Sequence, residues 1–103
     1  MTPADRPRDH EITILDRPGS SRYEIRLDGA FAGHADYRLL GDRIVFTHTE
    51  IDDRFEGHGL GGRLAGFALD DARARDLGVV PQCPFIASYI ERHPAYADLV
   101  VAP

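Results

Sequence analysis

The sequence has little cysteine, no cluster of basic residues and no long apolar run, and each shortage narrows the choice of protein class. Cys83 is the single cysteine among 103 residues, so the chain cannot form an internal disulfide. A small domain without disulfides suits a reducing compartment, and we expect a cytoplasmic protein. The formal net charge is −5, and the acidic residues are spread along the chain. This composition argues against nucleic acid as a partner, because phosphate backbones bind basic patches.

The chain is long enough for one hydrophobic core and too short for two, with 43% hydrophobic residues. No repeat or low-complexity segment is visible. Residues 1–9 are polar, include two prolines and lack the apolar stretch of a signal peptide or membrane span. We therefore predict a flexible tail at residues 1–9, a single domain at residues 10–103, and no membrane partner.

The first half of the chain has the pattern of an antiparallel meander. The turn-forming cluster at residues 18–21 separates two stretches that alternate polar with apolar residues. Asp28-Gly29 is a strong hairpin signal, because a type I′ turn needs positive φ at both central residues. Another turn is expected at Gly41-Asp42. The predicted strands are residues 11–15, 22–27, 31–39 and 43–51.

After Gly59 the apolar residues recur at helical spacing, which predicts a helix over residues 60–76. Gly78 is expected to end this helix in the left-handed conformation. A short apolar strand then begins at Val79. The order strand, helix, strand implies that this strand lies parallel to the strand ending at Ile51.

Two prolines interrupt the last predicted strand, which runs through Pro81 and Pro84. Because each lacks a backbone donor, the strand cannot pair along its full length. Residues 86–96 have helical spacing, and Pro94 is expected to end or kink that helix. The elements amount to about five strands and two helices in an α+β fold.

Four glycines lie across the opening of the first predicted helix, between Arg54 and Arg63, and each costs about 1 kcal/mol relative to alanine. No Ser, Thr, Asp or Asn stands at the capping position between Gly57 and Leu60. A bound anion would satisfy the free N–H groups, and the flanking arginines add positive potential. We therefore predict a site for a pyrophosphate-bearing ligand. The alternative is a flexible turn with tight helix–strand packing.

Gly57, Gly59 and Gly62 also match the glycine pattern of dinucleotide-binding proteins. That fingerprint belongs directly after the first strand of a parallel sheet. Here about half the chain precedes the glycines, and too little follows them to build a doubly wound sheet. The architecture therefore argues against a Rossmann fold.

Arg54-x-x-Gly57-x-Gly59 resembles the acetyl-CoA signature of the GCN5-related N-acetyltransferases, in which Gln or Arg is followed by Gly and then by Gly or Ala at the same spacing. Further similarity lies in His48-Thr49-Glu50, Gln82-Cys83-Pro84-Phe85, Tyr89 and His93-Pro94-x-Tyr96. Together they resemble the small, single-domain branch of that superfamily, over about residues 11–100.

The resemblance implies a twisted mixed sheet whose two central parallel strands splay apart. It implies acetyl-CoA as the acyl donor, with its pantetheine arm in that opening. Ordinary members carry two helices between their first strands, which help to form the acceptor site, whereas Asp28-Gly29 leaves room only for a hairpin. The cofactor-binding residues implied are Thr49, Ile51, Arg54, Phe55, Glu56, Gly57, His58, Gly59, Leu60, Gly61, Gly62 and Arg63.

Acetyl transfer to an amine needs a base that takes a proton from the ammonium form. Glu50 is the first candidate, because the family often places a catalytic glutamate at the end of the strand before the cofactor loop. The alternative is a surface acid beside Asp52. His48 is a second candidate and is expected on the same face as Glu50. A backbone N–H between Thr49 and Ile51 is the candidate group for polarising the thioester carbonyl.

Tyr89 lies roughly where the family often has the tyrosine that protonates the leaving thiolate; the alternative is a plain core tyrosine. Cys83, near the predicted strand opening, is a candidate for an acetyl-cysteine intermediate, and its alternative is a small buried hydrophobe. His48, His58, Cys83 and His93 match no recognised zinc spacing, and we expect no metal.

The leading hypothesis from the sequence is an N-acetyltransferase that moves an acetyl group directly from acetyl-CoA to an amine of unknown identity. The first alternative is a CoA or acyl-CoA binding module without turnover. A second alternative is an interaction domain whose glycine loop binds nothing. We expect a monomer or a weak dimer.

Overall fold

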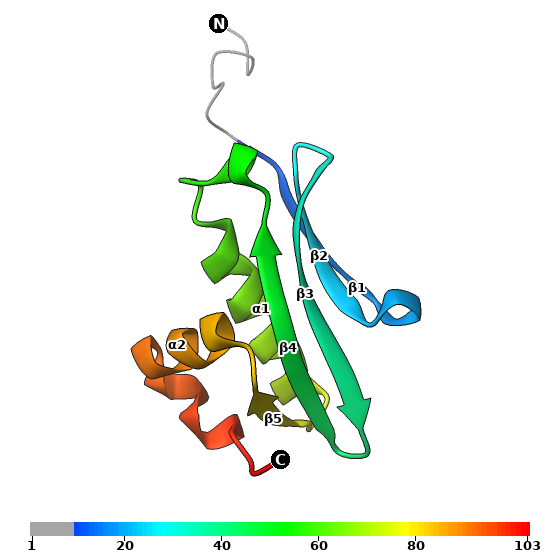
Figure 1. Cartoon of the computed structure of the whole chain (residues 1–103), viewed down its shortest axis with the longest axis vertical. Coiled ribbons are helices and arrows are strands. Elements are labelled where there is room, and N and C mark those ends of the chain that lie inside the picture. The colour runs from blue at the N-terminus through cyan, green and yellow to red at the C-terminus, as the bar shows by residue number, and fades with distance from the viewer. Residues whose placement is uncertain (1–9) are drawn as a thin grey trace, which may run out of the picture.

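The computed structural model describes residues 10–103, so the predicted tail at residues 1–9 lies outside the described part. Five strands form one sheet in chain order, which confirms the predicted α+β architecture (Figure 1). The strands are β1 (Ile12–Arg17), β2 (Arg22–Leu27), β3 (Ala30–Leu40), β4 (Arg43–Ile51) and β5 (Gly78–Pro81). The helices are α1 (Leu60–Ala74) and α2 (Pro84–Arg92), with the 3-10 segments η2 (Pro18–Ser20), η3 (Asp53–Phe55) and η4 (Pro94–Leu99).

Strands β1 to β4 form the predicted antiparallel meander. The hairpin between β2 and β3 turns at Asp28 (φ 52°) and Gly29 (φ 85°), both with the positive φ that the sequence pattern requires. Register shifts interrupt the β2–β3 pairing after Ile25 and the β3–β4 pairing after Asp36. Such irregularities bend and twist a sheet locally.

The pairing between β4 and β5 is parallel, as predicted, and it is short. Residues 43–46 of β4 pair with residues 78–81 of β5. The last backbone hydrogen bond between the two segments runs from the Cys83 N–H to the Phe46 carbonyl at 2.9 Å. Pro84, predicted inside the strand, is instead the first residue of α2, where its missing N–H costs no helical hydrogen bond. Residues 47–51 of β4 therefore extend beyond β5.

The end of α1 differs from the prediction. The left-handed residue is Asp76 (φ 60°), and Gly78 has no positive φ. The chain turns earlier, with the Leu77 N–H donating to the Ala72 carbonyl at 2.9 Å. Gly78 is required for a different reason, because a Cβ there would lie 2.8 Å from a methyl group of Val101. The predicted second helix is divided at Pro94 into α2 and η4.

The helices lie against one face of the sheet, and the core forms between them. Tyr23, Ile25 and Leu27 of β2 point to this face, whereas Arg22 and Glu24 point to the other. Within residues 10–103 no helix covers that other face of β2 and β3 (Figure 1). We call it the open face. None of the helices in the described part is long and apolar enough to cross a membrane.

Candidate functional site

The start of α1 is built to leave backbone N–H groups free. Gly59 is the N-cap in a left-handed conformation (φ 70°), and no side chain caps the helix. The first helical hydrogen bond runs from the Arg63 N–H to the Gly59 carbonyl at 3.2 Å. Within residues 10–103, no N–H group between Gly57 and Gly62 has a hydrogen-bond partner. A Cβ on Gly57 or Gly59 would meet no atom within 4 Å, so this loop faces open space.

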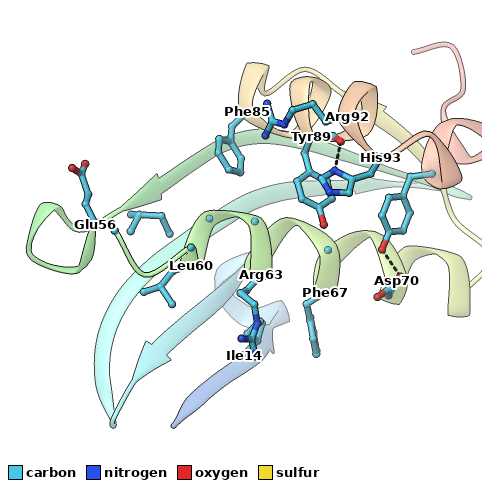
Figure 2. Close-up of a pocket in the computed structure, with 17 residues that line it drawn as sticks. Ile14, Glu56, Leu60, Arg63, Phe67, Asp70, Phe85, Tyr89, Arg92 and His93 are labelled. Atoms are coloured by element: carbon cyan, nitrogen blue, oxygen red, sulfur yellow. Dashed lines mark hydrogen bonds between the residues drawn. The ribbon is translucent and has the colours of Figure 1, made fainter. Parts of the chain in front are cut away.

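These N–H groups border a groove of about 920 Å³ between α1, α2 and η4 (Figure 2). Three glycines of α1 allow aromatic side chains of α2 to come close. A Cβ on Gly61 would lie 2.8 Å from the Phe85 ring, and one on Gly66 would lie 3.0 Å from the Tyr89 hydroxyl. The residues that line the groove are Ile14, Ile51, Glu56, Gly57, Gly59, Leu60, Gly61, Gly62, Arg63, Gly66, Phe67, Asp70, Phe85, Tyr89, Arg92, His93 and Tyr96.

The wall formed by α2 and η4 is aromatic and fixed by hydrogen bonds. The Tyr89 and His93 rings stack with centroids 3.9 Å apart, and His93 Nδ1 donates to the Tyr89 carbonyl at 2.9 Å. The Tyr96 hydroxyl donates to Asp70 Oδ1 at 2.8 Å, and this bond to a carboxylate raises the pKa of Tyr96 to about 12. Arg92 also lines this wall. The wall thus combines stacked rings with a cation, a chemistry suited to flat rings and phosphates.

Eight of the predicted cofactor residues line the groove: Ile51, Glu56, Gly57, Gly59, Leu60, Gly61, Gly62 and Arg63. Arg54, Phe55, His58 and Thr49 do not. Arg54 Nη2 donates to Asp52 Oδ2 at 2.9 Å, and this pairing holds the pKa of Asp52 below its usual range. The Arg54 guanidinium also lies 5.4 Å from the centroid of the Phe55 ring. His58 packs edge-on against His10 at 5.1 Å. The arginine of the signature is therefore paired with Asp52 and does not line the groove.

The sequence patterns did not assign the α2 side of the groove to cofactor binding. Phe85, His93 and Tyr96 belong to the family motif but carried no predicted role, and Arg92 was not singled out. The helical spacing of Phe85, Tyr89 and Arg92 places all three on the groove side. This spacing is the signal in the sequence that identifies the wall.

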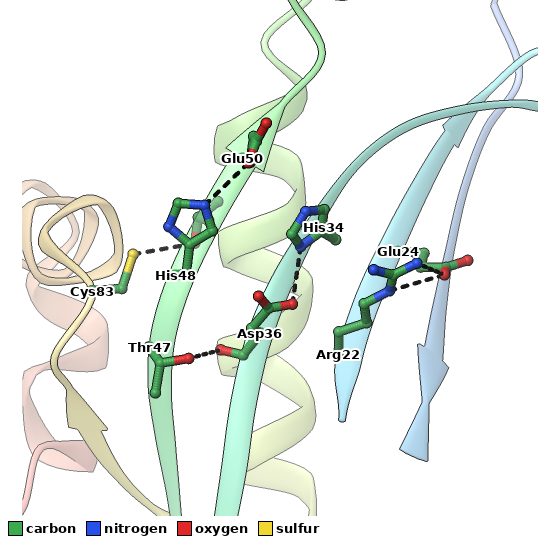
Figure 3. A network of polar contacts seen from close by, with 9 residues as sticks. Arg22, Glu24, His34, Asp36, Thr47, His48, Glu50 and Cys83 are labelled. Carbon is green, nitrogen blue, oxygen red and sulfur yellow. Dashed lines mark hydrogen bonds and ion pairs between the residues drawn. The ribbon is translucent and has the colours of Figure 1, made fainter. Parts of the chain in front are cut away.

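Glu50 and His48 lie together on the open face (Figure 3), which confirms their predicted common face. His48 Nε2 and Glu50 Oε1 are 3.2 Å apart, and both side chains are more than half exposed. His34 of β3 lies beside them, with its ring centroid 6.0 Å from that of His48. Glu50 also lines a second, smaller pocket between β3 and η3.

Cys83 is buried, and its Sγ donates to Thr49 Oγ1 at 3.3 Å across the β4–β5 opening. The four predicted catalytic residues therefore occupy different places. Tyr89 lines the groove, Glu50 lines the second pocket, and neither pocket is lined by His48 or Cys83. Ile51 is the residue that borders both pockets. The assignments of these side chains to catalysis stay predictions.

No group of three or more His, Cys, Asp or Glu side chains is placed to hold a metal ion in the part of the chain that the structure describes. The four residues weighed as a zinc set, His48, His58, Cys83 and His93, are therefore not gathered into a site.

Comparison with known proteins assigns the sequence to a family. The model of a family described as GCN5-related N-acetyl-transferase matches residues 22–99. The chain is 37% identical to Protein NATD1 of Gallus gallus and of Mus musculus over 59 residues, which are 56% of this chain and 54% of each relative. It thus spans about half the length of these curated relatives.

A solved structure agrees with this assignment. The solution structure of a GCN5-like putative N-acetyltransferase from Staphylococcus aureus has a TM-score of 0.64 to this chain at 22% sequence identity. The match covers 90% of this chain and 89% of that chain. At this level of identity the likeness shows a shared fold.

Proposed function

This chain belongs to the GCN5-related N-acetyltransferase family, and we propose that it binds acetyl-CoA and transfers the acetyl group to an amine. The observation that carries the proposal is the run of N–H groups from Gly57 to Gly62, which have no partner within residues 10–103 and border a groove of about 920 Å³. Free N–H groups at a helix start bind phosphate oxygens, and pockets of this size hold cofactors.

In the proposed complex the pyrophosphate lies against the N–H groups at the start of α1, and Arg63 adds positive charge. The pantetheine arm runs to the opening beside residues 47–51 of β4, where β5 no longer pairs. The pyrophosphate and the pantetheine arm thus each meet a surface of matching chemistry.

The proposed reaction is direct transfer. The amine nitrogen attacks the thioester carbon after Glu50 has taken its ammonium proton, directly or through water. A backbone N–H between Thr49 and Ile51 stabilises the negative oxygen that forms on the carbonyl. The carbon–sulfur bond then breaks, and the CoA thiolate takes a proton, for which Tyr89 is the proposed donor. The nitrogen loses its second proton through water, which returns a proton to Tyr89 and leaves a neutral amide. His48, 3.2 Å from Glu50, is the second candidate base.

The position of Cys83 supports direct transfer over an acetyl-cysteine route. Its thiol is 2% exposed and its hydrogen is used in the bond to Thr49. The sequence contains no lysine, so an acetyl group found on the intact protein by mass spectrometry can be assigned to Cys83 or the N-terminus. We expect no acetylated protein after incubation with acetyl-CoA. The single thiol also supports a reducing compartment, such as the cytoplasm.

The experiment that tests the proposal is a calorimetric titration with acetyl-CoA and with CoA, followed by measurement of free thiol with and without a panel of amines. Saturable binding and amine-dependent thiol release are the expected results. Absence of binding to either ligand would refute the proposal.

A second candidate function is CoA binding without turnover. The observation that favours it is the placement of Glu50 and Tyr89 in different pockets. Saturable binding with no thiol release for any amine of the panel would support this candidate.

A further inference from the structure

The second pocket, which we call the β3–β4 pocket, combines acidic and aromatic side chains and has a volume of about 330 Å³. It lies where the end of β4 and η3 meet the start of β3, on the far side of Ile51 from the groove. Its lining consists of Phe31, Gly33, His34, Glu50, Ile51, Asp52 and Asp53. The acetyl-CoA site proposed above uses one of these acids, Glu50, as a base and leaves the rest of the pocket without a role.

The pocket carries negative charge that the salt bridges of residues 10–103 neutralise only in part. Of its three acids, Asp52 is paired with Arg54 through contacts of 2.9 and 3.1 Å. Glu50 contacts only the imidazole of His48 among the described residues, and it is 66% exposed. Asp53 lies in the first turn of η3, and the ion pair of the neighbouring Arg54 is made with Asp52, so no ion pair of the described residues includes Asp53. Two carboxylates thus remain to attract a cation.

Two aromatic side chains line the same pocket as these carboxylates. Phe31 is 36% exposed and stacks on His34, with ring centroids 6.1 Å apart. His34 is held in place by Asp36, whose Oδ1 is 2.9 Å from His34 Nδ1. The Arg22 guanidinium lies 5.5 Å from the Phe31 centroid, so this ring already contacts one cation. Aromatic faces together with carboxylates bind alkylammonium groups.

The β3–β4 pocket adjoins the groove closely because β3 has a glycine at the crossing point. A Cβ on Gly33 would lie 2.5 Å from the Glu50 carbonyl oxygen and 2.6 Å from Ile51 Cδ1. Glycine therefore lets the Ile51 side chain lie flat against β3. Because Ile51 lines both pockets, they meet at this side chain, and a short aliphatic chain lying along it would reach from one pocket toward the other.

We propose that the β3–β4 pocket binds the second ammonium group of an aliphatic diamine, while the first amine lies at Glu50. The substrate class is then a diamine or polyamine, and a monoamine is a poor substitute. The role of the diamine as acetyl acceptor rests on the function proposed above. Its binding to the pocket does not.

The test compares diaminobutane with butylamine, which has one ammonium group on a carbon chain of the same length. Each amine is titrated into the full-length isotope-labelled protein, and the amide signals of Gly33 and Asp53 are followed by nuclear magnetic resonance. We expect diaminobutane to bind at least about tenfold more tightly than butylamine at low salt. In high salt this preference should shrink, because exposed ion pairs are screened.

Asp53→Asn is the decisive variant, since it removes one charge and keeps the shape. It should lower the affinity for diaminobutane about fivefold, as expected for a solvent-exposed ion pair, and leave the affinity for butylamine unchanged. Asp42→Asn is the matched control, because Asp42 is 90% exposed in the β3–β4 turn. Phe31→Leu should lower the affinity for both amines, because it removes the aromatic face. Equal affinity for the two amines, or no shift at Gly33 and Asp53, would overturn the proposal.

Calorimetry with acetyl-CoA separates this inference from the function on which it rests. If acetyl-CoA binds and diaminobutane does not prefer the pocket, the diamine inference alone is wrong. If diaminobutane binds as expected and acetyl-CoA does not, the pocket is retained and the transferase proposal is wrong.

Discussion

The two ends of α1 are built on opposite principles. The first half contains Gly61, Gly62 and Gly66, starts without a capping side chain and faces a groove. The second half contains no glycine and ends in a closed network of side chains with β1, β2 and β3. In that network the Tyr23 hydroxyl donates to Asp71 and the Tyr37 hydroxyl donates to Asp16, each at 2.6 Å.

Arg75 joins the two halves of this network, with Nη1 3.2 Å from Asp71 Oδ2 and 3.4 Å from Asp16 Oδ2. Tyr23 is fully buried, so its hydroxyl needs the partner that Asp71 provides. At this end both tyrosine hydroxyls donate to carboxylates, whereas at the other end N–H groups have no partner within residues 10–103. The C-terminal end of α1 therefore contributes to stability, and its N-terminal end is available for ligand binding.

Gly59→Glu should produce the largest effect of any substitution at the two ends of α1. It puts an anion where we expect phosphates, so acetyl-CoA affinity should fall at least about 100-fold, or about 2.7 kcal/mol. Calorimetry measures the loss. The matched control is Gly41→Glu, because Gly41 also has a positive φ (62°) and no atom within 4 Å of an added Cβ. Equal loss of affinity in both variants would indicate strain or unfolding as the cause.

Tyr23→Phe tests the closed end. Removing the hydroxyl deprives Asp71 of one donor, and the free energy of unfolding should fall by about 1.5 kcal/mol. Acetyl-CoA affinity should not change, because Tyr23 does not line the groove. Urea denaturation and calorimetry measure the two quantities. A loss of affinity without a loss of stability would contradict the separation of the two ends.

Alkaline pH should weaken the same network. Burial is the main cause that raises the pKa of Tyr37 to about 12 and the pKa of Tyr23 further. Above pH 10 the unfolded chain releases phenolic protons that the folded chain keeps, so stability falls as pH rises. We expect the free energy of unfolding to fall by about 1 kcal/mol from pH 10 to pH 11, roughly half of what two fully protected phenols would lose. The double variant Tyr23→Phe, Tyr37→Phe should show a much flatter profile in urea denaturation.

Gly62→Ala should give the smallest effect. We expect it to raise the free energy of unfolding and to lower the affinity for acetyl-CoA. The added Cβ would be 3.7 Å from the Tyr89 ring, an ordinary contact, and alanine favours the helix by about 0.5 kcal/mol or more. The methyl group narrows the groove, so acetyl-CoA should bind about threefold more weakly. Gly66→Ala is the comparison, because its Cβ would be 3.0 Å from the Tyr89 hydroxyl and the gain in stability should be lost.

Local signals in the sequence were enough for the elements that depend on local geometry. The bounds of β2 and β4, the Asp28-Gly29 turn and the uncapped start of α1 at Gly59 all agree with the predictions. Each depends on a φ preference or on a short polar–apolar pattern. The parallel pairing of β5 with β4 followed from the connection between them.

Features that depend on contacts between distant residues were not predicted. Gly78 was assigned to a helix end because glycine favours positive φ, but its actual constraint is the side chain of Val101, which is far from it along the sequence. The stacking of Tyr89 on His93 and the bond between Tyr96 and Asp70 depend on how α2 and η4 dock against α1. The spacing of apolar residues within one helix does not predict how that helix docks against another.

The short pairing of β4 with β5 has a consequence for association between molecules. Over residues 43–46, β4 is an interior strand, but over residues 47–51 it has β3 on one side and no strand of the described part on the other. A strand edge of this kind can recruit the edge of another chain, and natural proteins keep such edges short or blocked. Here Pro81 and Pro84 flank the gap and offer no N–H for a new ladder. A ligand bound in the opening would cover the exposed edge of β4. Bound substrate would then reduce the tendency of two molecules to associate through this edge.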